Sequence, residues 1–397
     1  MGTKFKAILS LFFVLTSFLF LPSVYAGRFK EVKQVIMGKE YRIENAVKDG
    51  KEGCWVYWGE EKVWWEPKPW HTAKLKEIGP AYYDIWTQPG LNFPWDDPME
   101  AREKYTVDQV VIRGINAINL ALGCPDVVNY YAGGIRSPRG KVRTKKGLEW
   151  YRSNVYHDYG GKYPKEEGKL VRRYTWSAVY PEDISGMSGI NWSYSGKKED
   201  DIWFYLPSVR KVRRMSVGSR QDFFLGTAGR NEDVFLTKPI HKYKIIRTEL
   251  LSEHSEELFE YGKGLPGYDI LVTPGKGHGL LDGVGTPCWV VEVTLPEDWY
   301  CAKQIRWYDI KTTDFFVEYS YDKKGRKIRI LGEQMGTPDE EKPLHCLWQG
   351  FLVVDYDTGY RSNVNWQKSS IGEVEIPEET FDKFFCLKEV KTRFWWK

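Results

Sequence analysis

The chain has 397 residues and a formal net charge of +4, and 16% of its residues are aromatic, including 18 Trp. Such a nearly neutral chain does not indicate a general nucleic-acid partner, which would require a basic surface. The length suits two average domains, although β-rich single domains also reach this size. The aromatic content is sufficient for a large core or for an aromatic-lined cavity.

The first 26 residues have the pattern of a secretory signal peptide. Lys4 and Lys6 precede an apolar run over residues 7–21, and residues 24–26 form a small-residue cleavage site. The apolar run is too short for a membrane anchor, and no later segment is apolar for long enough to span a bilayer. We therefore expect cleavage after Ala26 and a soluble protein in the periplasm or outside the cell. Cleavage would lower the net charge to +2, because it removes two lysines and no acid.

Residues 27–148 form an N-terminal segment that is rich in aromatic residues and proline and has weak periodicity. Two short strands are expected at 54–58 and 62–65, separated by a glycine turn. Residues 106–122 carry apolar side chains at helical spacing and are followed by a glycine, so they predict a helix. The basic, glycine-rich stretch 132–148 predicts a loop or a hairpin.

From residue 149 onward the pattern predicts one mainly β domain, 149–397. The expected strands are separated by Gly, Pro, Asp and Asn turns. They are 149–156, 170–180, 189–195, 201–206, 209–217, 233–236, 242–250, 288–294, 299–309, 314–321, 326–333, 346–355 and 360–365. A hairpin turn is expected at 321–326, and a helix is expected at 378–390, entered through Pro377. Many antiparallel strands with one or two helices imply a sheet curled around a core, with helices packed on or in it.

Six cysteines are widely spaced along the chain. They are Cys54, Cys124, Cys288, Cys301, Cys346 and Cys386. In an oxidising compartment up to three disulfides could form, and six cysteines allow fifteen pairings. Because no CxxC pair occurs, neither a zinc site nor thioredoxin-like chemistry is supported, and the connectivity stays open.

The segment 200–215 is the most informative part of the chain. It predicts a strand, a proline turn and a second strand that is rich in Arg and Lys. Side chains alternate between the two faces of a strand, so Arg213 and Arg214 are expected on opposite faces. At least one cation then points toward the inside of the sheet, where it needs an anionic partner.

Two hypotheses follow for the cations of this segment. The first is a structural network of ion pairs with Asp222, Glu232 and Asp233. The second is contact with an anionic head group or with an acidic partner. The sequence alone leaves both open.

Motifs of known catalytic families are absent from the sequence. No GxSxG, HExxH or GxxxxGK[ST] motif occurs, and the glycine-rich loop at 275–279 lacks phosphate-loop spacing. The six histidines are scattered without the spacing of metal ligands. The many tryptophans fit core packing, a cavity lining or sugar-binding platforms. We expect no catalytic residue, no metal and no cofactor.

The residues around the basic strand resemble a known bacterial family, the domain of unknown function 1329. The resemblance rests on Trp203-Phe204-Tyr205-Leu206-Pro207, then Arg210-Lys211-Val212-Arg213-Arg214, then Asp222, Gly226 and Asp233. Residues 173–176 and 186–194 fit the same pattern upstream, as do residues 303–309 and Gly325 downstream. The similarity covers roughly residues 170–397, in which order and spacing agree.

This family is similar to the LolA and LolB lipoprotein carriers. The resemblance implies an incomplete, half-open antiparallel β-barrel whose apolar concave face is covered by helices. It also implies a periplasmic carrier that moves a lipid, a lipoprotein or another hydrophobic ligand between the inner and outer membranes. The helices expected at 106–122 and 378–390 would then be lids. An inner-membrane exporter and an outer-membrane protein would be its partners, by analogy.

The candidate binding residues come from the family signature. They are Trp203, Tyr205, Arg210, Arg213, Arg214, Asp222 and Asp233. Acyl chains would gain about 0.8 kcal/mol per buried CH₂ group, and an arginine near the rim could pair with a phosphate or carboxylate head group.

One alternative is a periplasmic glycan-binding protein or hydrolase that acts on envelope polysaccharide, which would need paired carboxylates in a Trp-lined cleft. Another is an envelope scaffold, which predicts a filled barrel without a cavity.

Overall fold

The computed structural model describes most of the chain in several stretches. They are residues 32–36, 38–65, 126–159, 164, 166–195, 198–216, 218–235, 242–251, 265, 285, 287–309, 315–336, 347–371, 379 and 385–388. The chain divides into two compact units, Met1–Ala81 and Tyr82–Lys397. The predicted signal peptide and the helix predicted at 106–122 lie outside the described residues, so both stay predictions. No helix in the described stretches has the length and apolar character needed to cross a membrane.

The first unit contains a four-stranded antiparallel sheet with strands in chain order. The strands are β1 (Val32–Ile36), β2 (Lys39–Lys48), β3 (Lys51–Trp58) and β4 (Glu61–Trp65). One face of the sheet is buried and carries Tyr41, Ile43, Cys54, Val56 and Trp58. The strands predicted at 54–58 and 62–65 are confirmed, and buried and half-buried side chains alternate along 54–58.

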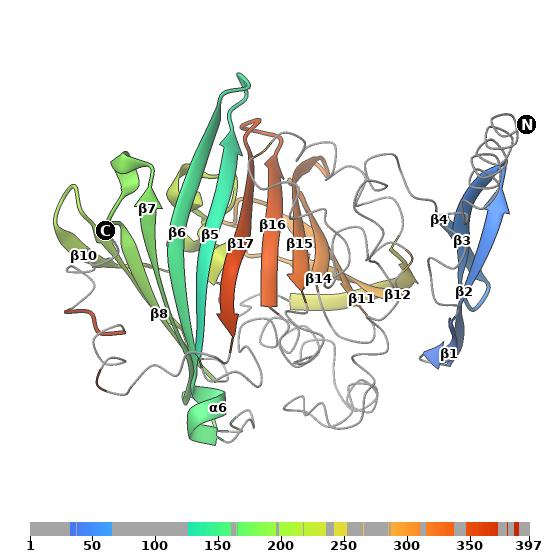
Figure 1. Cartoon of the computed structure of the whole chain (residues 1–397), viewed down its shortest axis with the longest axis horizontal. Coiled ribbons are helices and arrows are strands. Elements are labelled where there is room, and N and C mark those ends of the chain that lie inside the picture. The colour runs from blue at the N-terminus through green and yellow to red at the C-terminus, as the bar shows by residue number, and fades with distance from the viewer. Residues whose placement is uncertain are drawn as a thin grey trace, which may run out of the picture. The chain divides into compact units, whose positions relative to one another are not determined.

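The second unit contains a 13-stranded antiparallel sheet (Figure 1). Its strands are β5 (Asp126–Arg136), β6 (Val142–Ser153), β7 (Leu170–Tyr180), β8 (Ser188–Tyr194), β9 (Asp201–Leu206), β10 (Lys211–Arg214), β11 (Lys242–Leu250), β12 (Pro287–Thr294), β13 (Lys303–Asp309), β14 (Phe315–Tyr321), β15 (Lys327–Gly336), β16 (Leu347–Asp355) and β17 (Arg361–Ile371).

The strand order shows that the sheet joins two meanders. It runs β10-β9-β8-β7-β6-β5-β17-β16-β15-β14-β13-β12-β11. The pairing of β5 with β17 connects the two halves, while β10 and β11 form the two edges. The sheet curls but does not close, so the predicted half-open antiparallel barrel is confirmed (Figure 1).

Several predicted elements have different bounds in the structure. The stretch 132–148 lies in the β5–β6 hairpin, so the prediction of a hairpin, rather than a loop, is confirmed. The predicted domain boundary at 148/149 falls within β6. The second strand of the signature is limited to Lys211–Arg214, because Arg210 occupies a turn with a left-handed φ of 52°.

Two predicted elements differ from the structure. The strand predicted at 233–236 is part of a short helix, α7 (Asn231–Phe235). A short apolar run there does not distinguish a strand from a buried helical turn. In the helix predicted at 378–390, Glu379 is helical, but residues 385–388 form turn and irregular backbone. Most other residues of that stretch lie outside the described part of the chain.

One face of the large sheet is covered by the chain's own residues 218–235, which we call the covering segment. It contains two 3₁₀ turns, η3 (Gly218–Gln221) and η4 (Phe224–Gly226), and the helix α7. Figure 1 shows these yellow-green turns inside the curl, behind β5 and β6. The covering segment is not one of the two predicted lid helices, so the role of 106–122 as a lid stays a prediction.

Apolar packing holds the first half of the covering segment on the sheet. Phe224 packs edge-on against Trp176 of β7 at a centroid distance of 5.4 Å. Trp176 in turn contacts Phe204 of β9 at 5.7 Å. Gly189 of β8 lies directly beneath Trp176, where a β-carbon would collide with the indole ring. A glycine at this position therefore lets the tryptophan lie flat over the neighbouring strand.

Candidate binding cavity

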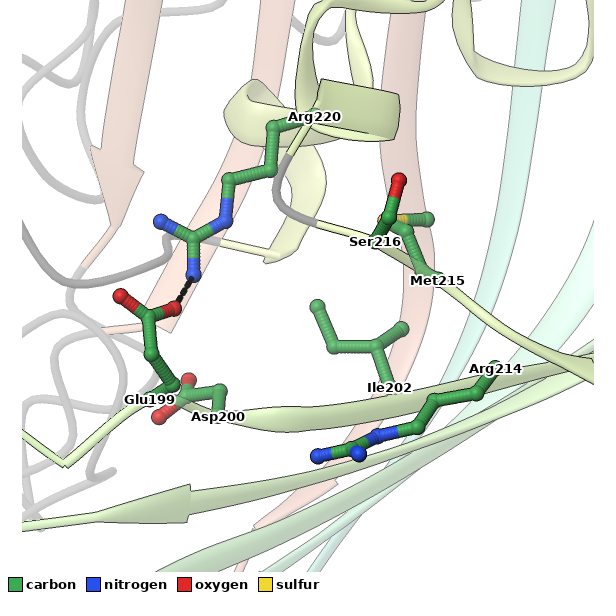
Figure 2. A pocket seen from close by; sticks show the side chains of 7 residues that line it. All are labelled: Glu199, Asp200, Ile202, Arg214, Met215, Ser216 and Arg220. Atoms are coloured by element: carbon green, nitrogen blue, oxygen red, sulfur yellow. Dashed lines mark hydrogen bonds and ion pairs between the residues drawn. The ribbon is translucent and has the colours of Figure 1, made fainter.

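A cavity of about 420 Å³ lies beside the β9–β10 hairpin, at the edge of the large sheet. It is lined by Glu199, Asp200, Ile202, Arg214, Met215, Ser216 and Arg220 (Figure 2). Four of these side chains are charged and two are apolar. The volume is in the lower part of the range of about 300–1,000 Å³ that is typical of small-molecule sites.

The apolar wall of the cavity consists of Ile202 and Met215. The backbone N–H of Met215 donates to the Ile202 carbonyl at 2.8 Å, which places the two residues side by side. Ile202 is buried and also belongs to the apolar cluster of Trp176 and Phe224, against which Met215 packs. The cavity wall is therefore continuous with the apolar core under the covering segment.

Arg220 supplies a buried cation to the cavity. It comes from η3, and its side chain is only 4% exposed. Its Nη2 atom forms an ion pair with Glu199, whose side chain is 45% exposed (Figure 2). A buried guanidinium needs an anion beside it, and Glu199 provides one from the rim.

Arg214 supplies a second guanidinium, from the edge strand β10. Its side chain is 65% exposed and pairs with Asp201 of β9. The other carboxylate oxygen of Asp201 accepts a hydrogen bond from the Tyr194 hydroxyl at 2.8 Å. Burial, followed by this bond to Asp201, raises the pKa of Tyr194 to about 12. Tyr194 is therefore a neutral donor at physiological pH.

The two carboxylates that line the cavity already have partners. Glu199 pairs with Arg220. Asp200 accepts hydrogen bonds from the Ser193 hydroxyl at 2.8 Å and from the Tyr194 backbone at 3.3 Å. A hydrolytic site needs a carboxyl group that can exchange a proton with substrate, and these contacts hold both groups in other roles. The arrangement suits the binding of an anion beside an apolar group better than acid–base chemistry.

A second polar site, which we call the buried ionic cluster, lies between the covering segment and strands β13–β15. Its members are Glu232, Asp233, Arg306, Glu318 and Arg329. Arg329 is 1% exposed and binds both Asp233 and, at 3.1 Å, Glu318. Arg306 binds the other oxygen of Glu318 at 2.8 Å. These pairs attach α7 to the sheet through buried charges.

Glu232 gives this cluster one more carboxylate than it has guanidinium groups. Glu232 is half-buried, and its Oε1 atom is sealed from solvent without a hydrogen-bond partner. Burial, then the charges of Asp233 and Glu318, raises its pKa to about 7. Protonation of Glu232 would balance the cluster at two acids and two arginines.

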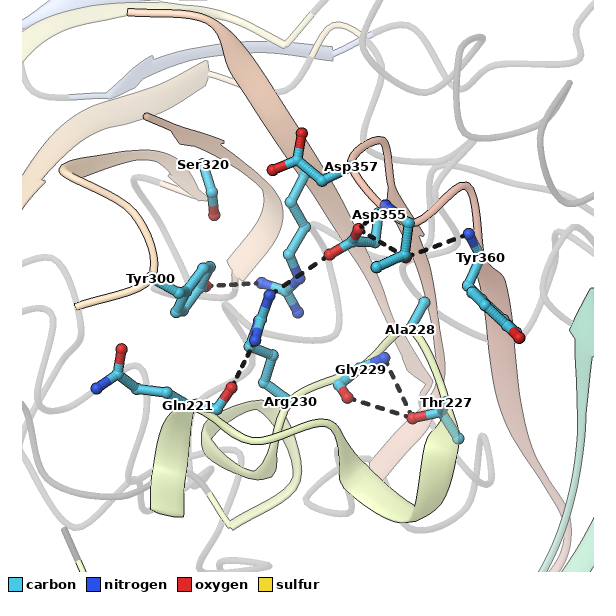
Figure 3. A network of polar contacts seen from close by, with 12 residues as sticks. Gln221, Thr227, Ala228, Gly229, Arg230, Tyr300, Ser320, Asp355, Asp357 and Tyr360 are labelled. Atoms are coloured by element: carbon cyan, nitrogen blue, oxygen red, sulfur yellow. Dashed lines mark hydrogen bonds and ion pairs between the residues drawn. The ribbon is translucent and has the colours of Figure 1, made fainter. Parts of the chain in front are cut away.

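Arg230 ties the covering segment to the sheet at a further point (Figure 3). Its guanidinium lies 3.5 Å from Asp355 of β16 and donates to the Gln221 carbonyl at 2.6 Å. The guanidinium also lies 4.0 Å from the centroid of the Tyr300 ring. The neighbouring Ala228 N–H donates to the Ser362 hydroxyl at 2.7 Å. The covering segment is thus fixed across several strands of the sheet.

The structure brings only one of the seven sequence-predicted binding residues, Arg214, to the cavity. Trp203 and Tyr205 lie on the face of β9 opposite Ile202, where they pack with Ile190, Trp192 and Leu387. Arg214 shares that face through its register with Trp203, but it lies at the end of β10, beside the cavity. Asp233 belongs to the buried ionic cluster. Arg210, Arg213 and Asp222 are exposed.

The predicted ion-pair network has different partners in the structure. Arg214 pairs with Asp201 on the neighbouring strand rather than with Asp222 or Asp233. Asp233 pairs with Arg329, 96 positions away in the sequence. Arg213 and Arg214 do face opposite sides, since they are paired in register with Phe204 and Trp203 respectively. The alternation argument is therefore confirmed, while the assignment of partners was wrong.

Sequence reasoning missed Glu199, Arg220 and Arg329. Glu199 and Asp200 directly precede β9, so a polar pair at the start of the signature strand was an available signal. Arg220 had none, because it lies in a short 3₁₀ turn without periodicity. Among the residues that the structure describes, no group of three or more His, Cys, Asp or Glu is placed to hold a metal.

Four cysteines lie in the described part of the chain, and none of these four lines the cavity. Cys54, Cys288 and Cys301 are buried and Cys386 is half-buried. Burial, followed by the charge of Glu318, raises the pKa of the Cys301 thiol to about 12. Cys124 and Cys346 lie outside the described residues, so the disulfide pattern stays open.

The chain thus combines an open antiparallel sheet, its own covering segment and a small mixed cavity. A family model described as "Uncharacterized protein" matches residues 172–263, which contain the cavity and the covering segment. The comparison with curated proteins found no match.

Several solved structures are similar to this chain. A DUF1329 family protein from Desulfovibrio piger is 18% identical, with a TM-score of 0.49 over 74% of this chain and 99% of that chain. A putative outer membrane lipoprotein-sorting protein domain from Vibrio parahaemolyticus is 16% identical, with a TM-score of 0.48 over 71% of this chain and 97% of that chain. A LolA superfamily protein from Nitrosomonas europaea is 12% identical, with a TM-score of 0.43 over 70% and 98%. The two families named from the signature residues, domain of unknown function 1329 and LolA, both occur among these structures. The fold class itself follows from the strand order of this chain.

Proposed function

We propose that this protein is a non-enzymatic periplasmic carrier of an amphipathic ligand with an acidic head group. One observation carries the proposal. The cavity places the guanidinium groups of Arg214 and Arg220 beside the apolar side chains of Ile202 and Met215. A phosphate or carboxylate head group would pair with the arginines, and its apolar part would lie on the other wall.

The size of the cavity limits which part of the ligand it holds. About 420 Å³ accommodates a head group and the beginning of a chain. Because Ile202 also belongs to the apolar cluster beneath Phe224, an acyl chain would continue along the sheet face under the covering segment. The carrier function would then require the covering segment to move aside when the chain enters.

The location and the partners are part of the proposal. The predicted signal peptide supports export to the periplasm, which cell fractionation with an intact and a deleted signal would test. A carrier in that compartment would exchange ligand with an inner-membrane exporter and an outer-membrane protein. The alternative of a glycan-binding protein or hydrolase has less support, because the described residues that line the cavity include no Trp and their two acids are engaged.

Native mass spectrometry of protein purified from its own cells tests the proposal. We expect a co-purifying species whose mass corresponds to a lipid or another amphipathic molecule with an acidic group. Organic extraction should remove it, and the stripped protein should rebind a single-chain phospholipid. Repeated ligand-free spectra, together with no binding of that phospholipid by the stripped protein, would refute the carrier.

A further inference from the structure

The small N-terminal sheet has a face that combines aromatic rings with cations. Trp55 and Tyr57 of β3 lie beside Trp64 and Lys62 of β4, their register partners. Arg42 of β2 is paired with Tyr57 on the other side. We call this surface the aromatic–cationic face.

The two faces of the small sheet differ in burial, and the aromatic–cationic face is the less buried one. Tyr41, Val56 and Trp58 on the opposite face are at most 3% exposed. In contrast, Trp55, Tyr57 and Trp64 are half-buried, and the lysines beside them are exposed. Val35, on the same side of the edge strand β1, is 70% exposed. The sheet therefore presents large aromatic and apolar groups on a face that is not its core.

The cations of this face lie over its rings. The Lys62 ammonium is 3.9 Å from the Trp55 centroid and 4.9 Å from the Tyr57 centroid. The Arg42 guanidinium lies 3.9 Å from the Tyr57 centroid. Lys48 lies 5.3 Å from the Trp55 centroid and 5.9 Å from the Trp64 centroid. Such contacts hold the positive groups close to the aromatic surface.

The charge of the face is positive. The strand register places five cations (Lys33, Arg42, Lys48, Lys51 and Lys62) and two acids (Glu40 and Glu44) on it, a net charge of +3. Both acids are bound by Arg42. Within the described stretches, Lys48 and Lys62 form no ion pair with an acid. Their charges are thus available to an outside anion.

We propose that the aromatic–cationic face docks the protein on an anionic lipid surface. Tryptophan and tyrosine favour the membrane–water interface, and lysines near an anionic surface each add about fivefold to the affinity. Val35, which is exposed on the same side of the sheet, adds an apolar group to this face. Sugar stacking is less favoured, because a sugar needs open ring faces and Lys62 and Arg42 already cover those of Trp55 and Tyr57.

The proposal does not depend on the cavity, which belongs to the other unit. It is tested by co-sedimentation of the purified full chain with vesicles. One set contains phosphatidylcholine alone, and the other contains about one quarter phosphatidylglycerol. Both sets are measured at low salt and at roughly 0.5 M salt, where screening shortens the range of surface charge interactions to a few ångströms.

Three variants make the test specific. Lys48→Gln/Lys62→Gln removes two charges of the face, and Val35→Asp removes its exposed apolar group. Lys211→Gln/Lys244→Gln removes two exposed lysines of the large sheet and is the matched control. Far-ultraviolet circular dichroism establishes that each variant is folded.

The expected result is salt-sensitive binding to the anionic vesicles only. The Lys48→Gln/Lys62→Gln variant should bind about 25-fold more weakly, since each lysine contributes about fivefold. Val35→Asp should also weaken binding, and the control should bind within about twofold of the parent. The absence of vesicle binding, equal losses in the control, or binding to soluble polyphosphate in preference to vesicles would overturn the proposal.

Discussion

Arg329 of β15 and Asp233 of α7 form an ion pair that is closed off from solvent, with side-chain exposures of 1% and 4%. The pair joins the covering segment to the sheet across 96 positions of sequence. Because charges are costly to remove from water, each member depends on the other, and Arg329 also depends on Glu318. The covering segment is therefore attached by groups that cannot be separated in place without leaving a buried charge.

This attachment predicts a large effect of Arg329→Met. The substitution keeps much of the side-chain volume but leaves Asp233 buried without its cation. We expect the free energy of unfolding to fall by about 3–5 kcal/mol, as measured by urea denaturation. Arg326→Ala on the same strand hairpin is the control, because Arg326 is 62% exposed and pairs with Asp322 at the surface. Arg326→Ala should lower the free energy of unfolding by only about 0–1 kcal/mol. A similarly small decrease for Arg329→Met would contradict the role of the pair.

Glu232 predicts a pH dependence of stability. Its pKa is about 7 in the folded protein, against an ordinary value of 4.5. The folded state therefore holds more protons than the unfolded state between these two values. Stability contributed by Glu232 is fully present below pH 4.5 and is lost as the pH rises through 7. At about 1.4 kcal/mol per pKa unit, the loss reaches up to roughly 3 kcal/mol at pH 8.

Glu232→Gln separates this effect from other titrations. The surrounding charges are those of Asp233 on α7, Arg306, Glu318 and Arg329 on the sheet, with Tyr300 and Cys301 nearby. The variant should be more stable than the parent at pH 8. Its free energy of unfolding, measured by urea denaturation, should change much less between pH 5 and 8 than that of the parent. Glu297→Gln, at an exposed position, should keep the parental slope. Parallel profiles for parent and Glu232→Gln would show that Glu232 is ionised throughout.

The sequence predicted the elements whose pattern is local. Strand-forming runs between Gly, Pro, Asp and Asn turns located the strands 170–180, 201–206 and 242–250 with the bounds that the structure has. It also placed Arg213 and Arg214 on opposite faces. Such a pattern involves only residues that are close in sequence, so it can be recognised without knowledge of the tertiary fold.

Partners across the fold could not be predicted in the same way. Arg329 alternates with Ile328 and Ile330 in β15, a pattern that normally places a polar side chain in water. Here Arg329 is bound by Asp233 of the segment 218–235, so its side chain is buried. The short helix α7 also lacked a helical period, and Arg220 reaches Glu199 from a 3₁₀ turn. These contacts depend on where a loop lies over the sheet, which no local pattern specifies.

Phe224 predicts that the covering segment contributes to the core. Phe224 is 8% exposed and packs on Trp176. Phe224→Ala should lower the free energy of unfolding by about 3–5 kcal/mol, because it removes a buried ring and leaves a cavity. The adjacent Phe223 is 38% exposed, so Phe223→Ala is a matched control with an expected cost below about 1 kcal/mol. Equal small costs would mean that the segment rests on the sheet without packing into it.

The neighbouring arginines of β10 provide the sharpest comparison for the binding cavity. Arg214 lines it, whereas Arg213 projects from the opposite face of the same strand. A charge-assisted contact with a ligand is worth about 1.5–3 kcal/mol, so Arg214→Ala should weaken binding of a single-chain phospholipid by about 10- to 150-fold. Arg213→Ala should leave it within about twofold. The affinities are measured by native mass spectrometry titration of delipidated protein.

Stability separates loss of a ligand contact from loss of structure in this comparison. Both arginines are exposed, and the Arg214–Asp201 pair lies at the sheet edge, so each substitution should change the free energy of unfolding by about 1 kcal/mol or less. A selective loss of binding in Arg214→Ala at unchanged stability would then come from the cavity itself. If both variants lost binding equally, or neither did, Arg214 would be a structural tie to Asp201, and the acidic head group would have to be bound elsewhere.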